Sequence, residues 1–197
     1  MTRLPVLRRD QLDQSQAALF DALTSGPRGA RIVDAEGHLT GPYNAWLYSP
    51  GIGEAAQQLG AALRFRSSLP APLLELAILI TAREWTAQFE WWAHARLAEQ
   101  AGLDLAIIEA IKERRRPVFL APGQETVYEF CRDLLATRHV SQPLYARAVA
   151  LLGEAGVMEL VTLLGYYALI SMTLNVFEVP APAGTRLPAS PTAVLRA

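Results

Sequence analysis

The spacing of apolar residues constrains the fold of this chain more than any other feature. Apolar side chains recur every three or four residues in one segment after another, as in the stripe of Leu12, Leu19, Phe20 and Leu23. Alternation with a period of two, which is typical of strands, is confined to residues 29–39. The sequence therefore predicts an all-α fold, in which short connections place neighbouring helices antiparallel.

We expect the 197 residues to form a single domain with three parts. An N-terminal helix and loop arm covers residues 1–41, a helical core covers 42–178, and an extended tail rich in Pro and Ala covers 179–197. Hydrophobic residues make up 51% of the chain and charged residues 19%, which is slightly apolar for a monomer. Because surplus apolar surface is typical of subunit interfaces, we expect a homo-oligomer.

The charge of the chain argues against a nucleic-acid partner. The formal net charge is −1, and the only run of basic residues is a short one, at residues 112–117. That run follows an expected helix, where cations complement the negative end of the helix dipole. We therefore predict no nucleic-acid binding.

The cysteine content and the apolar segments limit the chain further. Cys131 is the single cysteine, which excludes a disulfide within the chain and a thiolate metal cluster, and we interpret it as a buried apolar residue. The first ten residues are too polar for a signal peptide. The longest apolar segment, residues 156–177, contains Glu159 and Asn175 and is expected to be a buried helix. No membrane span is predicted, and a cytoplasmic location is expected.

Three ionisable residues stand out because they lie in an otherwise apolar region. Glu75 belongs to "LLELAILI" (73–80), where an ionised carboxylate is unfavourable unless it has a partner. Glu90 and His94 are four residues apart, so a helix places them on the same face. A carboxylate beside a histidine fixes its tautomer and raises its basicity, which yields an acid/base unit in a pocket lined by tryptophan. The same pair is also compatible with a purely structural hydrogen bond, and both interpretations stay open.

The same residues are also candidate metal ligands. Such a site needs three or four ligands, and Glu75, Glu90 and His94 would supply three. With only three histidines in the chain, we predict no metal.

The segment "ELAILITAREWTAQFEWWAHARLAEQAGL" (75–103) resembles the signature of the carboxymuconolactone decarboxylase family, an all-helical group that includes the alkylhydroperoxidase-like proteins. The resemblance is specific over residues 72–112 and looser over 42–178. It implies an alkylhydroperoxidase-like helical bundle and a homo-oligomer, a trimer or a hexamer built from dimers.

The redox branch of this family carries Cys-x-x-Cys-x-x-x-His on this helix, with a glutamate upstream. Counting back from His94 places the two cysteines at Ala87 and Glu90, and the upstream glutamate matches Glu75. The glutamate–histidine pair is therefore retained, whereas the dithiol is absent. A dithiol peroxidase needs a nucleophilic thiolate and a resolving cysteine, so we reject this activity and assign the resemblance to the dithiol-lacking branch.

Members of that branch, as the resemblance implies, decarboxylate 4-carboxymuconolactone to the enol-lactone of 3-oxoadipate without a cofactor. The implied catalytic residues of this chain are Glu75, Glu90 and His94. His94 would protonate the dienolate left by loss of CO₂, and Glu75 would orient His94. Glu90 would take part in proton transfer or pair with Arg83. Two alternatives stay open: another small-molecule lyase or isomerase with the same residues, and a non-catalytic binding protein.

Three further residues are predicted to bind the substrate. Arg83 is suited to a bidentate contact with a carboxylate, Trp91 to the wall of the pocket, and Tyr43 to its mouth. Each has an alternative interpretation as a packing residue or a member of an ion pair. On the last apolar helix, either Tyr166 or Tyr167 is a candidate hydrogen-bond donor to a substrate oxyanion.

Overall fold

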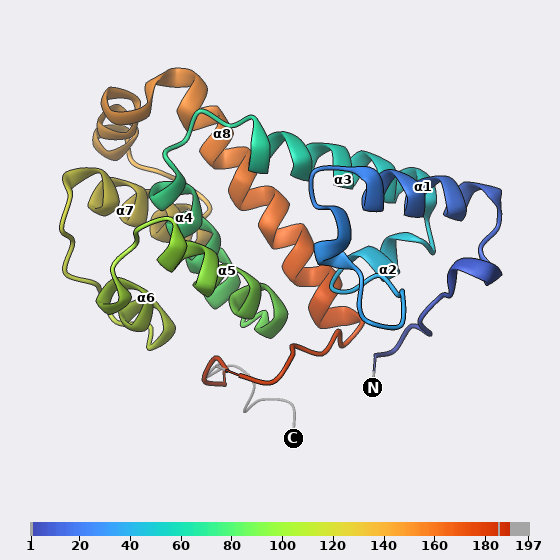
Figure 1. Cartoon of the computed structure of the whole chain (residues 1–197). Helices are drawn as coiled ribbons and strands as arrows, with labels where there is room; N and C mark the ends of the chain where they lie inside the picture. Colours follow the sequence, from blue (N-terminus) through green and yellow to red (C-terminus); the bar gives the residue numbers. More distant parts are fainter. Residues whose placement is uncertain (1, 185, 190–197) are drawn as a thin grey trace. The chain divides into compact units, whose positions relative to one another are not determined.

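The computed structural model describes residues 2–184 and 186–189 of the chain (Figure 1). Within this part, the regular structure is helical apart from an isolated antiparallel bridge between Val33 and Leu39, so the all-α prediction is confirmed. The chain divides into two compact units, residues 1–67 with 173–180 and residues 68–172 with 181–197. The predicted single domain stays a prediction. Residues 185 and 190–197 of the predicted tail lie outside the described residues.

The first unit holds the N-terminal arm. Its helices are η1 (Arg9–Gln11), α1 (Gln14–Ser25), η2 (Gly29–Ile32), α2 (Tyr43–Trp46) and α3 (Pro50–Phe65). Helix α3 approaches α1 and α2 closely at Gly53, where a Cβ atom would lie 2.7 Å from both Leu19 and Trp46 side-chain atoms. The buried Asn44 side chain accepts a hydrogen bond from Leu7 N and donates one to Pro5 O. The α2 segment therefore anchors the arm.

The second unit is a helical bundle built around α4. Its helices are α4 (Ala71–Glu84), α5 (Gln88–Gln100), α6 (Leu105–Lys112), α7 (Pro122–Thr137) and α8 (Gln142–Val176), whose last turn belongs with the first unit. Helix α4 packs against α5, α6 and α7, and every residue from Leu74 to Arg83 is buried. A helix that is apolar on all sides is stable only when neighbours surround it, which is the position α4 occupies.

The helices around α4 end in tight turns with a residue of positive φ. Thr86 after α4, Gly102 after α5 and Arg114 after α6 have φ values of 51°, 88° and 56°. In each turn a backbone N–H bonds back to the carbonyl five residues earlier, as Ala87 N does to Ala82 O at 2.9 Å. The turn at Thr86 reverses the chain within three residues, so α4 and α5 become antiparallel neighbours.

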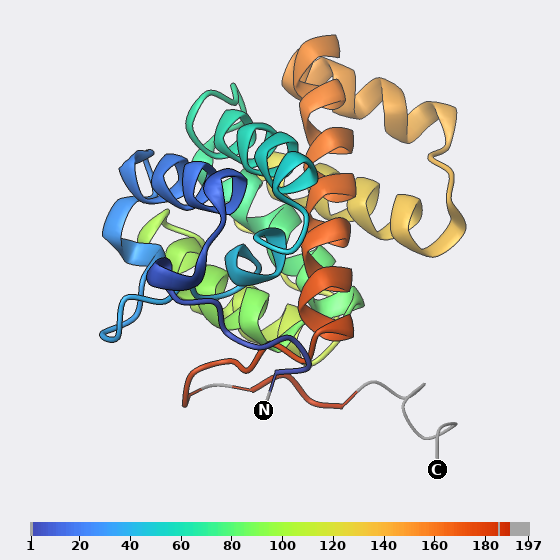
Figure 2. The same cartoon turned by 90° about the vertical axis from the view of Figure 1, so that its right-hand side faces the viewer.

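Helix α8 contains a sharp break at Gly153. This residue has φ 71° and ψ 169°, which no helical residue adopts, and Figure 2 shows the helix changing direction between its two segments. Such a conformation is essentially restricted to glycine. The helix therefore has two segments, one on each side of Gly153.

The described part of the tail docks on α5. The Gln88 side chain donates from Nε2 to Leu187 O at 3.0 Å and accepts from Leu187 N at 2.9 Å. The Leu187 side chain is buried, and Gly184 lies beside the Trp92 ring. The extended tail is therefore held by a side-chain amide that pairs with the backbone as a strand would.

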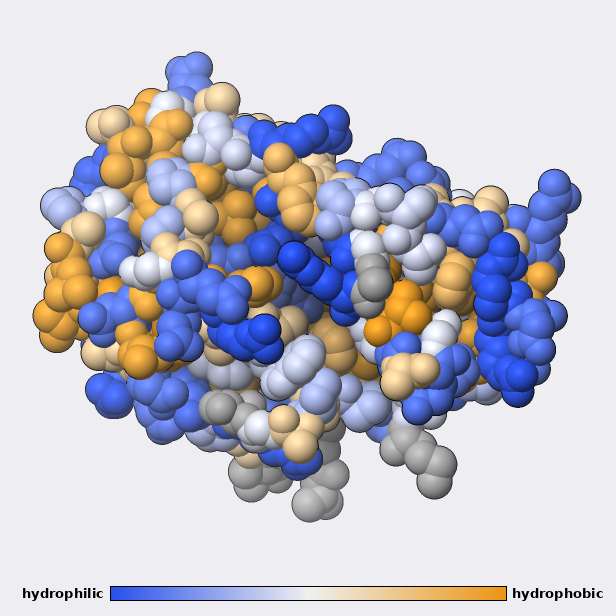
Figure 3. All heavy atoms as spheres, in the orientation of Figure 1, coloured by the Kyte–Doolittle hydropathy of each residue, from blue (hydrophilic) through white to orange (hydrophobic). Residues whose placement is uncertain are grey.

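Several apolar side chains are exposed on the second unit. In the α6–α7 loop, Val118 is 85% exposed and Leu120 71%, and Figure 3 shows hydrophobic residues gathered at the left edge, where Figure 1 places this loop. By length and composition alone, α8 is apolar enough to cross a membrane, with 33% of its most apolar window buried. The expected burial of residues 156–177 thus holds for one face only. A uniformly apolar sequence does not reveal which face of a helix is covered. The homo-oligomer stays a prediction.

Two glycines of α8 give a matched test of the break. Gly153→Ala should lower the free energy of unfolding by about 1–3 kcal/mol, because alanine is strained at this φ and ψ although no atom lies within 4 Å of the new methyl group. Gly165→Ala, inside the helix and equally unobstructed, should raise it by about 0.5–1 kcal/mol. Urea unfolding of both variants measures the difference. Equal effects would show that α8 continues unbroken through Gly153.

Candidate active site

Helix α4 brings a carboxylate into the core. Glu75 lies one turn after the helix start at Ala71, among residues that pack on all sides, and it is 3% exposed. A charged group in this setting requires a partner of opposite charge or strong hydrogen bonds. The sequence therefore fixes where the charge is buried, and the neighbouring helix has to supply the partner.

Helix α5 supplies that partner from its first two turns. The helix begins at Gln88, with Ala87 as its N-cap, so Glu90 lies in the first turn and His94 one turn later on the same face. The two side chains are 5% and 7% exposed. A carboxylate in the first turn is also favoured by the positive end of the helix dipole.

The imidazole of His94 lies between the two carboxylates. Its Nδ1 is 2.7 Å from Glu75 Oε2, and its Nε2 is 3.0 Å from Glu90 Oε1. With both carboxylates ionised, both ring nitrogens donate hydrogen bonds, which makes the ring an imidazolium. The predicted catalytic residues Glu75, Glu90 and His94 are thus brought together in one buried cluster.

The cluster favours the charged form of the histidine. Burial by itself lowers the pKa of His94, but the charge of Glu90 and the hydrogen bonds to both carboxylates outweigh it, so the pKa is raised above its usual value. A buried imidazolium with two hydrogen bonds holds a proton away from bulk water. Acid/base sites share this property with structural ion pairs.

An aromatic ring from α8 covers the histidine. The Tyr167 ring packs edge-on against His94 with 5.1 Å between ring centroids, and Tyr166 packs edge-on against Tyr167 at 5.4 Å. Both tyrosines are buried. The Tyr167 ring thus packs directly on the cluster.

The two adjacent tryptophans have different environments. Trp91 is 1% exposed, and its indole Nε1 has no hydrogen-bond partner among the described residues. Trp92 is 37% exposed and packs against Phe89. Trp91 therefore lies in the core one turn before His94, and its predicted substrate contact stays a prediction.

The structure gives Arg83 a different contact from the one predicted. Arg83 Nε donates to Lys112 O at the end of α6 at 2.7 Å, and Arg114 Nη2 donates to Arg83 O at the end of α4 at 3.1 Å. Each arginine thus satisfies a C-terminal carbonyl of the other helix. Burial, and next the charge of Arg114, lower the pKa of Arg83. Glu90 pairs with His94 rather than with Arg83.

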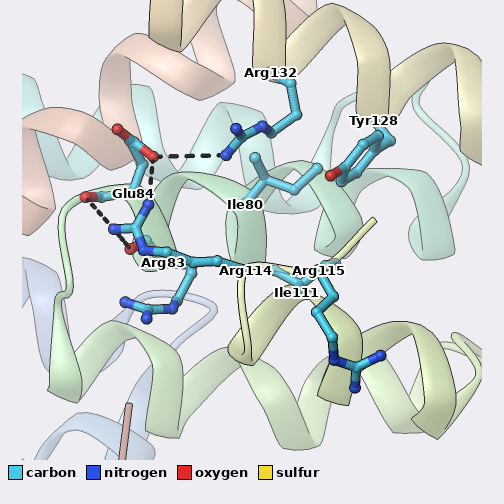
Figure 4. Close-up of a pocket in the computed structure, with 8 residues that line it drawn as sticks. All are labelled: Ile80, Arg83, Glu84, Ile111, Arg114, Arg115, Tyr128 and Arg132. Atoms are coloured by element: carbon cyan, nitrogen blue, oxygen red, sulfur yellow. Dashed lines mark hydrogen bonds and ion pairs between the residues drawn. The ribbon is translucent and has the colours of Figure 1, made fainter. Parts of the chain in front are cut away.

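The space beside Arg83 is small. A cavity of about 20 Å³ is lined by residues of α4, α6 and α7 and of the turn after α6: Ile80, Arg83, Glu84, Ile111, Arg114, Arg115, Tyr128 and Arg132. Figure 4 shows Arg114 and Arg132 directed at Glu84, whereas the Arg83 and Arg115 side chains point away from it. The guanidinium groups do not converge on one point, so we interpret this cluster as one that joins the C-terminal ends of α4 and α6. Substrate binding by Arg83 stays a prediction.

Tyr43 belongs to the first unit. Its ring packs edge-on against Trp46 at 5.2 Å, and the guanidinium of Arg28 lies 5.8 Å from its centroid. These contacts fit the packing interpretation of the α2 segment. The predicted role of Tyr43 at a pocket mouth stays a prediction.

The thiol of the chain is unsuited to redox chemistry. Cys131 on α7 is completely buried, and burial raises the pKa of its thiol. The thiolate is the reactive form of cysteine, so burial suppresses its nucleophilicity. The prediction of a buried cysteine is confirmed.

Metal-ligating atoms also approach one another in the loop before α2. Asp34, Glu36 and His38 place one ligand atom each within 4.8 Å of the others. Asp34 Oδ1 already accepts hydrogen bonds from the backbone N–H groups of Glu36 and His38, which is a common turn arrangement.

Ser171 on α8 was not singled out by sequence reasoning. It is completely buried, and its hydroxyl has no hydrogen-bond partner among the described residues. Its spacing of four residues from Tyr167 on an otherwise apolar helix is the signal that points to it.

A comparison with solved structures supports the predicted fold. The amino-acid sequence matches no protein-family model and no curated protein. The structure is similar to the crystal structure of an uncharacterized peroxidase-related protein from Silicibacter sp. TM1040, with a TM-score of 0.70, 12% sequence identity and coverage of 92% of each chain. The predicted all-α, alkylhydroperoxidase-like bundle is therefore confirmed. At this identity the similarity concerns the fold alone, and the decarboxylase family and its dithiol-lacking branch stay predictions.

Removing the charge of Glu90 should lower the pKa of His94. Glu90→Gln keeps an acceptor oxygen but removes the charge that contributes most to the raised pKa. A raised pKa stabilises the fold fully below the unfolded value of about 6.5, and this stabilisation is lost as the pH rises through the folded-state pKa. In Glu90→Gln the loss should therefore be complete at a lower pH. Titration of the His94 ring nitrogens by NMR measures the shift, and an identical midpoint in both proteins would refute it.

Replacing Arg83 separates its two interpretations. If Arg83 clamps the end of α6, Arg83→Met should lower the free energy of unfolding by about 1.5–3 kcal/mol, the usual worth of a hydrogen bond to a charged group. Arg96→Met, at an exposed position of α5, should change it by less than about 0.5 kcal/mol. Thermal unfolding tests both. Unchanged stability in Arg83→Met would favour the predicted substrate contact instead.

Proposed function

We propose that the protein is a cofactor-independent decarboxylase of the 4-carboxymuconolactone type, which acts on a small carboxylated lactone by acid/base chemistry at Glu75, Glu90 and His94. The observation that carries the proposal is the buried imidazole held between two carboxylates at 2.7 and 3.0 Å. One carboxylate is enough to fix a structural histidine. A second one, on the other nitrogen, gives the ring two routes for a proton.

The reaction would use this arrangement after the bond to CO₂ breaks. The electron pair of that carbon–carbon bond moves through the ring double bond towards the lactone carbonyl, which leaves a dienolate. Protonation of the dienolate at carbon gives the enol-lactone, and solvent later restores the proton to the protein. His94 would be the proton source, because the carboxylates on its two nitrogens favour its charged form.

The two carboxylates would have different roles. Glu75 lies on α4, which packs against three other helices, so it would orient the imidazole and balance its charge. Glu90 engages the Nε2 nitrogen, so a proton that leaves by this atom would pass through Glu90 or require its displacement. We assign Glu90 to proton transfer, in preference to the ion pair with Arg83 that the spacing allowed.

A dithiol peroxidase reaction does not fit the residues of this chain. The positions that would hold the two cysteines are Ala87, the N-cap of α5, and Glu90. Cys131 lies on α7 and is buried. The peroxidase-related name of the similar structure therefore describes that protein, and the proposal for this chain rests on its own cluster.

Turnover of 4-carboxymuconolactone tests the proposal. Loss of ultraviolet absorbance and release of CO₂ should be seen with the wild type. His94→Asn should reduce the rate by about 10²–10⁴-fold, as expected when a general acid is removed. His139→Asn is the matched control, because it makes the same change at an exposed histidine between α7 and α8.

Circular dichroism establishes that each variant is folded. Absence of turnover in folded wild-type protein would refute the substrate assignment. Equal turnover in wild type and His94→Asn would remove His94 from the mechanism.

A further inference from the structure

Two buried polar groups of the second unit have no partner. In the part of the chain that the structure describes, Trp91 Nε1 and Ser171 Oγ are the buried side-chain nitrogen and oxygen atoms that lack a hydrogen bond. The two residues are 1% and 0% exposed. A buried donor without an acceptor destabilises the fold, so each such group in a native protein calls for an explanation.

Ser171 departs from the behaviour of other helical hydroxyls in this chain. Thr81 on α4 donates to Ala77 O at 2.9 Å, and Thr162 on α8 donates to Met158 O at 2.8 Å. Both follow the usual pattern, in which a hydroxyl bonds to the carbonyl four residues earlier. The Ser171 hydroxyl makes no such bond, so it is available to a group from outside the helix.

The two groups lie at the same end of the contact between α5 and α8. Trp91 precedes His94 by one turn, and Ser171 follows Tyr167 by one turn, while the His94 and Tyr167 rings touch. Figure 1 shows α5 and the long segment of α8 running in roughly opposite directions. Because the helices are antiparallel, Trp91 and Ser171 therefore lie at about the same level along them, beside the cluster.

The chemistry of the two groups defines what they would bind. An indole N–H only donates, and a serine hydroxyl donates readily. The His94 nitrogens are both engaged by carboxylates, so the ring has no donor left to hold a ligand in place. An oxygen acceptor, as in a carboxylate or a lactone carbonyl, would satisfy both unpaired donors.

We propose that Trp91 Nε1 and Ser171 Oγ are the donors that bind a carboxylate or carbonyl oxygen of the ligand beside the Glu75–His94–Glu90 cluster. This inference rests on the proposed function in taking the cluster as a ligand site. It adds Ser171 as a binding residue. It also makes the Trp91 indole a hydrogen-bond donor to the ligand, whereas the sequence predicted Trp91 as part of the pocket wall.

Stability and binding should respond in opposite directions to Ser171→Ala. Removing an unsatisfied hydroxyl should leave the melting temperature unchanged or raise it. Thr81→Val, which removes a satisfied buried hydroxyl, is the matched control and should lower it. The KM for 4-carboxymuconolactone should rise roughly tenfold in Ser171→Ala, with a smaller effect on kcat, and should stay unchanged in Thr81→Val.

A second measurement does not depend on turnover. In protein labelled with ¹⁵N-tryptophan, the four indole N–H signals are resolved by NMR, and the signal that is missing in Trp91→Phe belongs to Trp91. Benzoate serves as a simple carboxylate probe. It should shift the Trp91 signal in the wild type, and about tenfold more benzoate should be needed in Ser171→Ala. Trp92→Phe controls for the loss of an indole ring nearby.

The outcomes separate this inference from the proposed function. A benzoate-dependent shift of the Trp91 signal without turnover would uphold the two donors and refute the decarboxylase. Unchanged KM and unchanged benzoate binding in Ser171→Ala would overturn the inference even if turnover occurs. It would also be overturned by a fall in melting temperature matching that of Thr81→Val, because the hydroxyl would then be bonded within the protein, or by a Trp91 signal that benzoate does not move.

Discussion

The hydrogen bonds of His94 to two carboxylates are the interaction on which the rest of the second unit depends. One bond crosses from α5 to α4, so it fixes the distance and rotation of the two helices at the centre of the bundle. The other bond lies within α5 and fixes the ring against its own helix. If the imidazole were removed, Glu75 and Glu90 would lose their charged partner in the core, which is unfavourable by several kcal/mol in buried pairs. Packing and electrostatics are therefore coupled at this point of the fold.

The turn between α4 and α5 makes this arrangement possible. Thr86 adopts a positive φ, and Ala87 N bonds back to Ala82 O, so the chain reverses over a few residues. The reversal places the early part of α5 beside α4 and presents Glu90 and His94 to Glu75. A positive φ is unfavourable for a β-branched residue such as threonine and is tolerated where the surroundings enforce it. Here the enforcement comes from the buried α4 on one side and the His94 cluster on the other.

The sequence predicted the cluster well because each of its members breaks a local pattern. Glu75 interrupts an apolar run, and Glu90 and His94 share a helical face, so burial and spacing were both readable. Arg83 was assigned near Glu90 because the two are seven residues apart, which corresponds to one helical face only if the helix is continuous. The turn at Thr86 ends that continuity, and no glycine or proline marks it in the sequence. Ser171 was missed because an unpaired hydroxyl is a property of packing, and a serine in an apolar helix usually bonds to its own backbone.

The cluster and the unpaired donors complement each other. The cluster has its proton and its acceptors arranged internally, so it is equipped to move a proton but has no free nitrogen donor with which to orient a ligand. Trp91 and Ser171 have donors without acceptors, so they are equipped to orient a ligand but cannot act as strong acids or bases. A structural ion pair alone would not require two unpaired donors within a turn of it, since filling those positions with apolar groups would stabilise the fold. Under the proposed function, these two donors beside His94 distinguish a ligand site from a core salt bridge, with the acid/base groups on α4 and α5 and the donors on α5 and α8.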